Sequence, residues 1–278
     1  MTAIDLYGNG QVAKALLRLL PDHVRVRNQY DSQGLVYQDA SVAGPVVAVD
    51  CTAPHYDGPG REAWNRHLRH LLDAGTPLVT CNKAPLATGW HDFATAHASA
   101  TVGGGTPILA AAKRLAPQAQ RFQLVASGTL SSVCDAIAGG ATVSEAIRGA
   151  QAAGFAEPDP SLDLNGTDTL AKAVILHNTL WPDRPLLIDD VPTRFQVSPS
   201  AIWAIAARGG VPRVVATVEP GCIAIAIQDA PWAGAPGDAA LRLEGDGTYL
   251  ITGPGAGPEV TARNRLADLE ALAVPVAA

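Results

Sequence analysis

The chain has 278 residues, of which 47% are hydrophobic and 17% charged, so it can bury the core of one or two domains and is not generally disordered. Its 20 basic and 26 acidic residues give a formal net charge of −6, and no basic stripe favours nucleic-acid binding. The longest stretch without Asp, Glu, Lys or Arg covers residues 93–112 and contains three consecutive glycines and a proline. This composition argues against a membrane span, so we expect no membrane partner.

The start of the chain has no basic region followed by an apolar one, which argues against a secretion signal. The four cysteines are far apart and form no CxxC pair. Scattered cysteines of this kind are typical of reduced thiols, so we expect a cytoplasmic protein.

The first 80 residues alternate between strand-like and helix-like segments. We predict strands over residues 3–7, 24–26, 46–50 and 77–81, and helices over residues 11–20 and 61–74. Such alternation favours a parallel sheet with crossover helices, which is an α/β arrangement.

The second half of the chain has a different pattern. Helices are predicted over residues 143–153, where Thr142 and Glu145 form a capping box, and over residues 167–177. The β-branched runs at 213–219 and 222–228 predict an antiparallel hairpin in an α+β domain.

Glycines and a proline at 103–107 suggest where one domain ends. We therefore expect a dinucleotide-binding domain over residues 1–104 and a substrate-binding, catalytic and dimerisation domain over residues 105–252. Residues 253–278 are expected to return to the first domain.

The first strand is followed by a glycine motif, G-x-G-x-x-A, that opens the first helix. This context is typical of the dinucleotide fingerprint of Rossmann-type domains, in which the glycines allow a tight turn and a close approach to a pyrophosphate. The candidate residues are Gly8, Asn9, Gly10, Gln11 and Val12.

The choice of nucleotide stays open at this stage. Asp31 stands where an acidic residue would bind the ribose hydroxyls of NAD, whereas Arg25 and Arg27 could accept the 2′-phosphate of NADP.

Three further segments carry polar groups or glycines at positions suited to a site. Asn82 and Lys83 follow the last predicted strand of the first domain, where ligands of parallel sheets lie, and Thr52 follows the strand before it. Residues 154–168 are rich in carboxylates, and Asp168 and Lys172 share one helix face, a spacing that alone is typical of an exposed ion pair. Residues 251–257 hold three glycines, among them Gly255, a candidate for contact with the cofactor.

Taken in chain order, these motifs resemble those of the homoserine dehydrogenase family, and the resemblance covers nearly the whole chain. It rests on residues 80–83, 102–107, 127–129, 157–172 and 253–257, of which 157–172 is the most specific. It implies hydride transfer between L-homoserine and L-aspartate 4-semialdehyde with NAD or NADP, in threonine and methionine biosynthesis. It also implies a homodimer, and a short form without a C-terminal regulatory domain.

The resemblance also implies roles for particular residues. Lys172 matches the acid/base lysine, and Lys83 matches a second lysine near the nicotinamide and the reacting oxygen. A free lysine has a pKa near 10.4, so Lys172 would act as a base at neutral pH only if burial beside cations lowered that pKa. The implied substrate-binding residues are Glu157 for the ammonium group, Asp163 and Asp168 for positioning, and Gly128 and Thr129 in a loop against the substrate.

A monovalent cation, Na⁺ or K⁺, is a further implication of the resemblance. Its ligands would be the backbone carbonyls of Val102, Gly104 and Thr106. Ser99 stands where the family has a glutamate, so only backbone ligation is carried over to this chain.

Two other functions compete with this one. A related NAD(P)-dependent dehydrogenase would act on a different amino-acid semialdehyde or keto compound, and a sensor would bind the nucleotide without catalysis. The presence of both lysines, Lys83 and Lys172, argues against the sensor.

Overall fold

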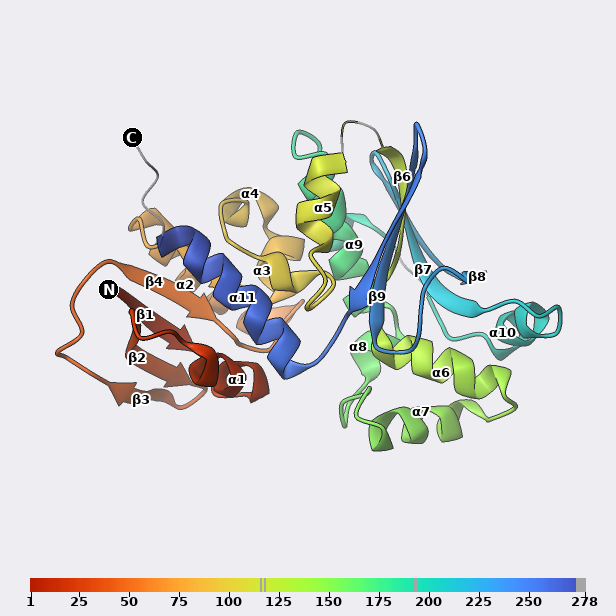
Figure 1. Cartoon of the computed structure of the whole chain (residues 1–278), viewed down its shortest axis with the longest axis horizontal. Helices are drawn as coiled ribbons and strands as arrows, with labels where there is room; N and C mark the ends of the chain where they lie inside the picture. Colours follow the sequence, from red (N-terminus) through yellow and green to blue (C-terminus); the bar gives the residue numbers. More distant parts are fainter. Residues whose placement is uncertain (116, 118, 193–194, 274–278) are drawn as a thin grey trace.

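A computed structural model describes residues 1–115, 117, 119–192 and 195–273 of the chain (Figure 1). The strands are β1 (Thr2–Tyr7), β2 (Val24–Asp31), β3 (Gly34–Gln38), β4 (Val46–Asp50), β5 (Leu78–Thr80), β6 (Ala119–Val125), β7 (Pro212–Glu219), β8 (Cys222–Asp229), β9 (Asp238–Gly245) and β10 (Thr248–Pro254). The α-helices are α1 (Gln11–Leu19), α2 (Gly58–Asp73), α3 (Lys83–Thr88), α4 (Trp90–Phe93), α5 (Ile108–Leu115), α6 (Gly128–Ala138), α7 (Val143–Ala152), α8 (Ser161–Leu164), α9 (Thr167–Leu180), α10 (Pro199–Ala206) and α11 (Pro258–Ala273). Short 3₁₀ helices are η1 (Ser99–Thr101) and η3 (Ile188–Asp190).

The first sheet has the strand order β3-β2-β1-β4-β5. Strands β2, β1, β4 and β5 are parallel, and β3 pairs antiparallel with β2. The expected parallel α/β sheet is therefore confirmed. The hairpin from β2 to β3 was not predicted, and it replaces the crossover helix that would connect two parallel strands at this place.

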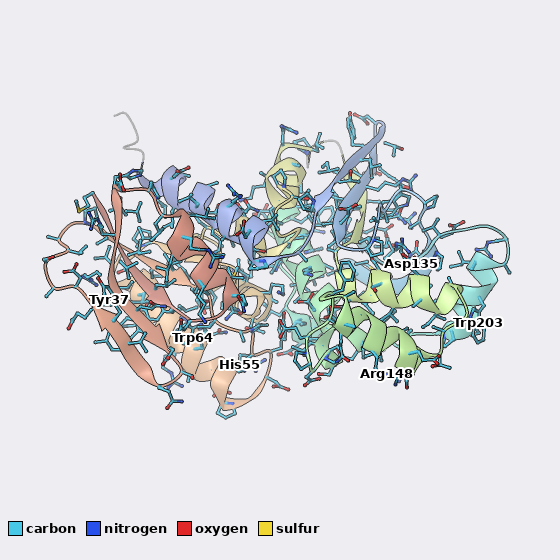
Figure 2. All side chains as sticks on the ribbon, turned by 60° about the horizontal axis from the view of Figure 1, so that its bottom comes forward. Tyr37, His55, Trp64, Asp135, Arg148 and Trp203 are labelled. Carbon is cyan, nitrogen blue, oxygen red and sulfur yellow. The ribbon has the colours of Figure 1, made fainter. Side chains whose placement is uncertain are left out.

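Apolar side chains alternate along these strands and bury both faces of the first sheet. Ile4 and Leu6 point to the face that α1 and α11 cover, where Leu16 and Leu269 join the same cluster. The opposite face packs against α2, α3 and α4 (Figure 1). Strand β3 is exposed throughout, and Tyr37 lies at the outer edge of the sheet (Figure 2).

The second sheet is antiparallel, in the order β10-β9-β6-β7-β8. The predicted hairpin is confirmed as β7 and β8, with Glu219 paired to Cys222. Leu124, Leu241 and Val218 face helices such as α5 and α9, and this contact forms the main core. The predicted capping box of Thr142 and Glu145 at the start of α7 is also confirmed.

Two linkers join the sheets and cross each other. Gly105 N donates to Pro254 O at 3.1 Å, and Thr106 Oγ1 donates to the same oxygen at 3.1 Å. A Cβ on Gly104 would lie 2.4 Å from Gly255 O, so the two backbones touch where the chain enters and leaves the second sheet.

The last helix, α11, packs against α1 and is fastened to the first sheet by a buried arginine. Arg265 is fully buried, and its Nη2 donates to Asp50 O at 2.6 Å and to Val79 O at 3.2 Å. Its Nη1 lies 2.8 Å from Cys51 Sγ and 2.9 Å from Cys81 Sγ. A helix from the end of the chain thereby holds the ends of β4 and β5 together. Within the described residues, none of the helices combines the length and hydropathy that crossing a bilayer requires.

Candidate active site

The glycine turn between β1 and α1 has the geometry that a dinucleotide needs. Gly8 has a φ of +114°, and a Cβ there would lie 2.8 Å from Cys51 O, so only glycine fits. A Cβ on Gly10 would meet nothing within 4 Å, and no side chain caps α1. The first amide groups of α1 are therefore free to bind a pyrophosphate, helped by the helix dipole. These residues fit the expected cofactor.

A buried aspartate organises the carboxyl ends of β4 and β5. Asp50 Oδ1 accepts from Thr52 N at 2.9 Å and from Thr52 Oγ1 at 2.7 Å, and its Oδ2 accepts from Thr80 Oγ1 at 3.0 Å. Asn82 Nδ2 then donates to Thr52 Oγ1 at 3.0 Å, and Asn82 Oδ1 caps α3 by accepting from Ala84 N at 3.0 Å. Thr52 and Asn82 were predicted from the sequence, but Asp50 was not, although an acidic residue that ends an apolar strand is a recognisable signal.

Two lysines from different halves of the chain share one carboxylate. Lys83 is the first residue of α3, and its Nζ lies 3.1 Å from Asp168 Oδ1. Lys172 lies one turn after Asp168 on α9, and its Nζ lies 2.7 Å from Asp168 Oδ2 and 2.5 Å from Ala126 O. The three side chains are only 14–18% exposed, so the pair of Asp168 and Lys172 is not the exposed ion pair that its spacing alone suggests.

The charges of this cluster stabilise one another. Burial alone would raise the pKa of Asp168, but the two lysines outweigh it and hold that pKa well below its usual range. Burial alone would lower the pKa of Lys83, and the Asp168 carboxylate outweighs it and raises that pKa. Asp168 is therefore an ionised group that fixes both ammonium groups.

A second carboxyl, Asp163 on α8, connects the cluster to the loop before α8. Its Oδ1 accepts from Ser127 Oγ at 2.8 Å, and its Oδ2 lies 3.0 Å from Thr129 Oγ1. Thr129 Oγ1 also donates a hydrogen bond at 2.7 Å to Phe155 O, a carbonyl oxygen that can act only as an acceptor. The hydroxyl of Thr129 has one proton, which it donates to Phe155 O. Its contact with Asp163 is therefore also a hydrogen bond when Asp163 carries a proton and donates it to Thr129 Oγ1. Burial, followed by the nearby charge of Asp168, raises the pKa of Asp163 in the same direction.

Two residues near the cluster were not found from the sequence. Ser127 caps α6 by accepting from Leu130 N at 3.1 Å while it holds Asp163. Tyr56 lies in the cluster of apolar side chains between α3 and α9, with its hydroxyl buried and without a hydrogen-bond partner among the described residues. Neither residue has a spacing or pattern that distinguishes it in the sequence.

Other candidate residues lie around this centre. Glu157 is exposed on the loop between α7 and α8, and Gln151 Nε2 donates to its backbone carbonyl at 3.2 Å. A Cβ on Gly128 would lie 3.5 Å from the Phe155 ring, so the start of α6 packs against that loop. A Cβ on Gly255 would lie 2.6 Å from Ala239 N, so the close packing of the backbone explains the absence of a side chain there without a cofactor.

The predicted cation ligands lie in the turn before α5. Gly104 O accepts from Asn264 Nδ2 at 2.7 Å, and Thr106 O accepts from Ile108 N at 2.7 Å, while Val102 is fully buried. Ser99 N donates to Asp268 Oδ2 at 3.0 Å. In the described part of the chain, no group of three or more His, Cys, Asp or Glu side chains could hold a metal ion. The cation stays a prediction.

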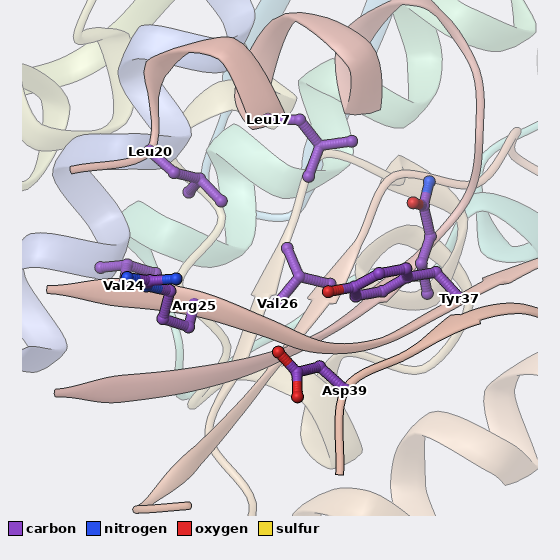
Figure 3. A pocket seen from close by; sticks show the side chains of 8 residues that line it. Leu17, Leu20, Val24, Arg25, Val26, Tyr37 and Asp39 are labelled. Carbon is purple, nitrogen blue, oxygen red and sulfur yellow. The ribbon is translucent and has the colours of Figure 1, made fainter. Parts of the chain in front are cut away.

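A pocket of about 360 Å³ lies elsewhere, between α1 and the β2–β3 hairpin (Figure 3). Leu17 and Leu20 line it from above, and Val24 and Val26 line it from the sheet. Val24, Arg25 and Val26 lie in the amino-terminal half of β2, whereas ligands of parallel sheets bind at the carboxyl ends, and Gln29 is the lining residue of β2 nearest to that end. Most of this pocket therefore lies along the part of β2 that is remote from the glycine turn.

A parallel sheet with a glycine turn for a pyrophosphate, joined to a buried cluster of two lysines and an aspartate, defines a dinucleotide-dependent dehydrogenase. The family model described as homoserine dehydrogenase matches residues 107–269. The chain belongs to the homoserine dehydrogenase family, a family of oxidoreductases, as its sequence motifs indicated.

Individual relatives agree with this assignment. A homoserine dehydrogenase of Sulfurisphaera tokodaii is 29% identical over 265 residues, which cover 86% of this chain and 81% of the relative. An NAD(+)-dependent homoserine dehydrogenase of Pseudomonas canavaninivorans is 31% identical, with 72% of this chain and 64% of the relative covered.

Solved structures share the fold. The homoserine dehydrogenase of Thermoplasma acidophilum has a TM-score of 0.79 at 22% identity and covers 98% of this chain and 99% of its own. A hyperthermophilic archaeal homoserine dehydrogenase in complex with NADPH has a TM-score of 0.77 at 22% identity and covers 99% of both chains. The expected NAD or NADP cofactor agrees with the family and with this fold.

Proposed function

We propose that the chain interconverts L-homoserine and L-aspartate 4-semialdehyde with NAD or NADP. The observation that carries this proposal is the contact of Lys83 and Lys172 with Asp168, which places an ammonium group of each half of the chain at one carboxylate. The family membership and the names of the relatives support the choice of substrate.

The chemistry that a bound nicotinamide supplies is the uptake or return of a hydride at the carbon that bears the hydroxyl. In oxidation the hydroxyl proton passes to Lys172 Nζ, which accepts it in the neutral amine form after giving up one of its own protons to solvent, and in reduction the ammonium form of Lys172 gives a proton to the new alkoxide. Lys83, held by Asp168, stabilises negative charge on the reacting oxygen. The bond of Lys172 to Ala126 O keeps its Nζ at one position during the transfer.

Substrate recognition is assigned to the groups around this centre. Glu157 receives the substrate ammonium, and the start of α6, with Gly128 and Thr129, lies against the substrate. Asp163 holds Thr129 and thereby the loop that carries Glu157, because Thr129 also bonds to Phe155 O. This network supports a shaped site for a small amino acid.

We extend the proposal to the organisation of the protein. Residues 1–104 with 253–278 form the cofactor domain, residues 105–252 form the catalytic and dimerisation domain, and the active form is a cytoplasmic homodimer that serves threonine and methionine biosynthesis. The contact of α11 with α1 supports the first point, and four free cysteines support the cytoplasm. Residues 274–278 lie outside the described part.

The test is the absorbance of reduced nicotinamide in a mixture of protein, homoserine and NAD or NADP at alkaline pH. We expect an increase that saturates with homoserine. A panel of other amino alcohols separates this function from a related dehydrogenase, because saturation with a different alcohol only would contradict the proposal. Nucleotide binding without turnover of any alcohol would favour a sensor.

A further inference from the structure

The end of β2 lies beside the glycine turn. Gly8 N donates to Tyr30 O at 2.8 Å, and Gln29 Nε2 donates to Gly8 O at 3.2 Å. Asp31 is the next residue and the last of β2, so its carboxyl group follows the turn that receives the pyrophosphate. In Rossmann-type domains this is where the adenosine ribose is recognised.

The carboxylate of Asp31 is held in place by the hairpin. Its Oδ1 accepts from Gln33 N at 2.7 Å across the two-residue turn that joins β2 to β3. Its Oδ2 makes no hydrogen bond within the described residues, and the side chain is partly exposed. An ionised carboxyl is an acceptor only, which suits the two hydroxyl donors of an unphosphorylated ribose.

The two arginines that could have bound a 2′-phosphate are elsewhere. Arg27 donates to Asp5 through Nε at 3.0 Å and Nη2 at 2.5 Å, and it lies four residues, about 13 Å along the strand, before Asp31. Arg25 lies about 20 Å before Asp31 and lines the pocket beneath α1 together with Asp39 (Figure 3).

The segment around Asp31 supplies no other lysine or arginine in their place. Residues 28–60 cover the end of β2, the hairpin, β4 and the loop to α2, and they contain no Lys or Arg but four aspartates. A phosphate monoester carries a charge of about −1.5 to −2 at neutral pH. Beside Asp31 such a group would meet a like charge and no counter-charge from this segment.

We infer that this chain uses NAD in preference to NADP, and that Asp31 is the residue that determines the preference. The inference rests on the proposed dinucleotide site and adds the choice of nucleotide. The hairpin that replaces the usual crossover helix fixes the acid at the ribose position.

The test is isothermal titration calorimetry of NADH and NADPH, which measures binding without turnover. We expect the wild-type chain to bind NADH at least about 50-fold more tightly than NADPH, since the carboxylate favours one ribose and repels the other. In Asp31→Asn the amide oxygen still accepts from Gln33 N, so the hairpin keeps its turn, and we expect the preference to fall at least about tenfold. In Asp31→Arg we expect the preference to disappear or reverse.

Asp22→Arg is the matched control, because it makes the same change of charge at an exposed position before the amino end of β2. We expect it to leave the ratio of the two dissociation constants within about twofold. Equal or tighter binding of NADPH by the wild-type chain, or an unchanged ratio in Asp31→Asn, would overturn the inference. If neither nucleotide binds, the proposed function itself is wrong, so the two failures are distinguishable.

Discussion

Asp168 connects the two halves of the site by forming an ion pair with a lysine from each half. Its carboxylate binds Lys83 from α3 and Lys172 from α9, so the cluster carries two positive charges for one negative charge. The excess positive charge suits a site in which an alkoxide develops. Burial alone would raise the pKa of Asp168, but these lysines outweigh it and hold that pKa well below its usual range, so Asp168 is ionised at neutral pH.

The first prediction concerns Lys172. In Lys172→Ala we expect kcat for homoserine oxidation to fall about 10³-fold, because the proton acceptor is lost, while the dissociation constant of the reduced cofactor changes little. Steady-state kinetics and calorimetry measure the two quantities. Lys113→Ala, which removes an exposed lysine from α5, is the control and is expected to retain activity. Near-normal turnover in Lys172→Ala would exclude Lys172 as the essential acid or base.

Most of the candidate site could be named from the sequence because each family motif is a short, continuous segment of the chain. The spacing of Asp168 and Lys172 correctly predicted a shared helix face. It did not show that Lys83, which lies 89 positions before Lys172, contacts the same Asp168 carboxylate. Asp50, Ser127 and Tyr56 were missed because their roles depend on contacts between distant elements, which leave no local pattern.

At the level of elements, the strands and helices with regular hydrophobic periodicity were predicted within a few residues. The β2–β3 hairpin was not, since every residue of β3 is exposed and the end of β2 is polar, so no face alternates clearly. The bulge in the pairing of β1 with β2 shifts the register between Ile4 and Asp5 and further masks the pattern.

The glycine turn gives a second prediction, from two neighbouring glycines that differ in their surroundings. Gly8→Ala is expected to destabilise the fold by about 1–3 kcal/mol, because its φ is +114° and the new Cβ would lie 2.8 Å from Cys51 O. Gly10→Ala is expected to keep the stability of the wild type and to lose affinity for the reduced cofactor, because the added methyl group occupies the pyrophosphate position.

Urea denaturation and calorimetry on both variants measure these effects. Wild-type stability in Gly8→Ala would show that the turn tolerates a side chain. Unchanged cofactor affinity in Gly10→Ala would contradict the place we give to the pyrophosphate.

The third prediction concerns α9, which His177 ties to the turn between β7 and β8. His177 is fully buried, and its Nε2 accepts from Gly221 N at 2.9 Å, so the ring is neutral. Burial lowers the pKa of His177 below its ordinary value of 6.5. Below pH 6.5 the unfolded chain takes up a proton that the folded chain does not, so stability is full above pH 6.5 and falls as the pH decreases.

In His177→Gln the amide oxygen can accept from Gly221 N without titrating. We therefore expect the decrease in Tm between pH 7 and pH 5.5 to be smaller in this variant than in the wild type. His70→Gln, at an exposed position of α2, is the control and should keep the wild-type slope. Equal slopes in all three proteins would remove His177 as a source of acid sensitivity.

At the scale of the whole molecule, two linkers cross between the sheets, and α11 covers one face of the first sheet. Arg265 connects α11 to backbone oxygens of β4 and β5, and Leu269 adds to the core of the first sheet. The sequence indicated that the end of the chain returns to the first half, but not that a buried arginine fastens it, because a charged residue in a helix normally suggests an exposed face.

The fourth prediction tests this attachment. Arg265→Ala removes a fully buried side chain together with the hydrogen bonds that it donates to the backbone oxygens of Asp50 and Val79, so we expect a loss of about 2–4 kcal/mol in the free energy of unfolding. Arg263→Ala, two positions earlier and exposed, is expected to change it by less than about 0.5 kcal/mol. Urea denaturation measures both. Equal stability of the two variants would show that α11 does not depend on Arg265.

The position of α11 determines the order in which the parts of the first sheet are covered during synthesis. A ribosome releases β1 to β5 first, then the whole of the second sheet, and only then the helix that covers one flank of the first sheet. Until that last helix emerges, part of the apolar face formed by residues such as Val79 is open to water and to chaperones. The nascent chain therefore completes the covering of its first sheet only after it has made the whole second sheet, although it began the first sheet first.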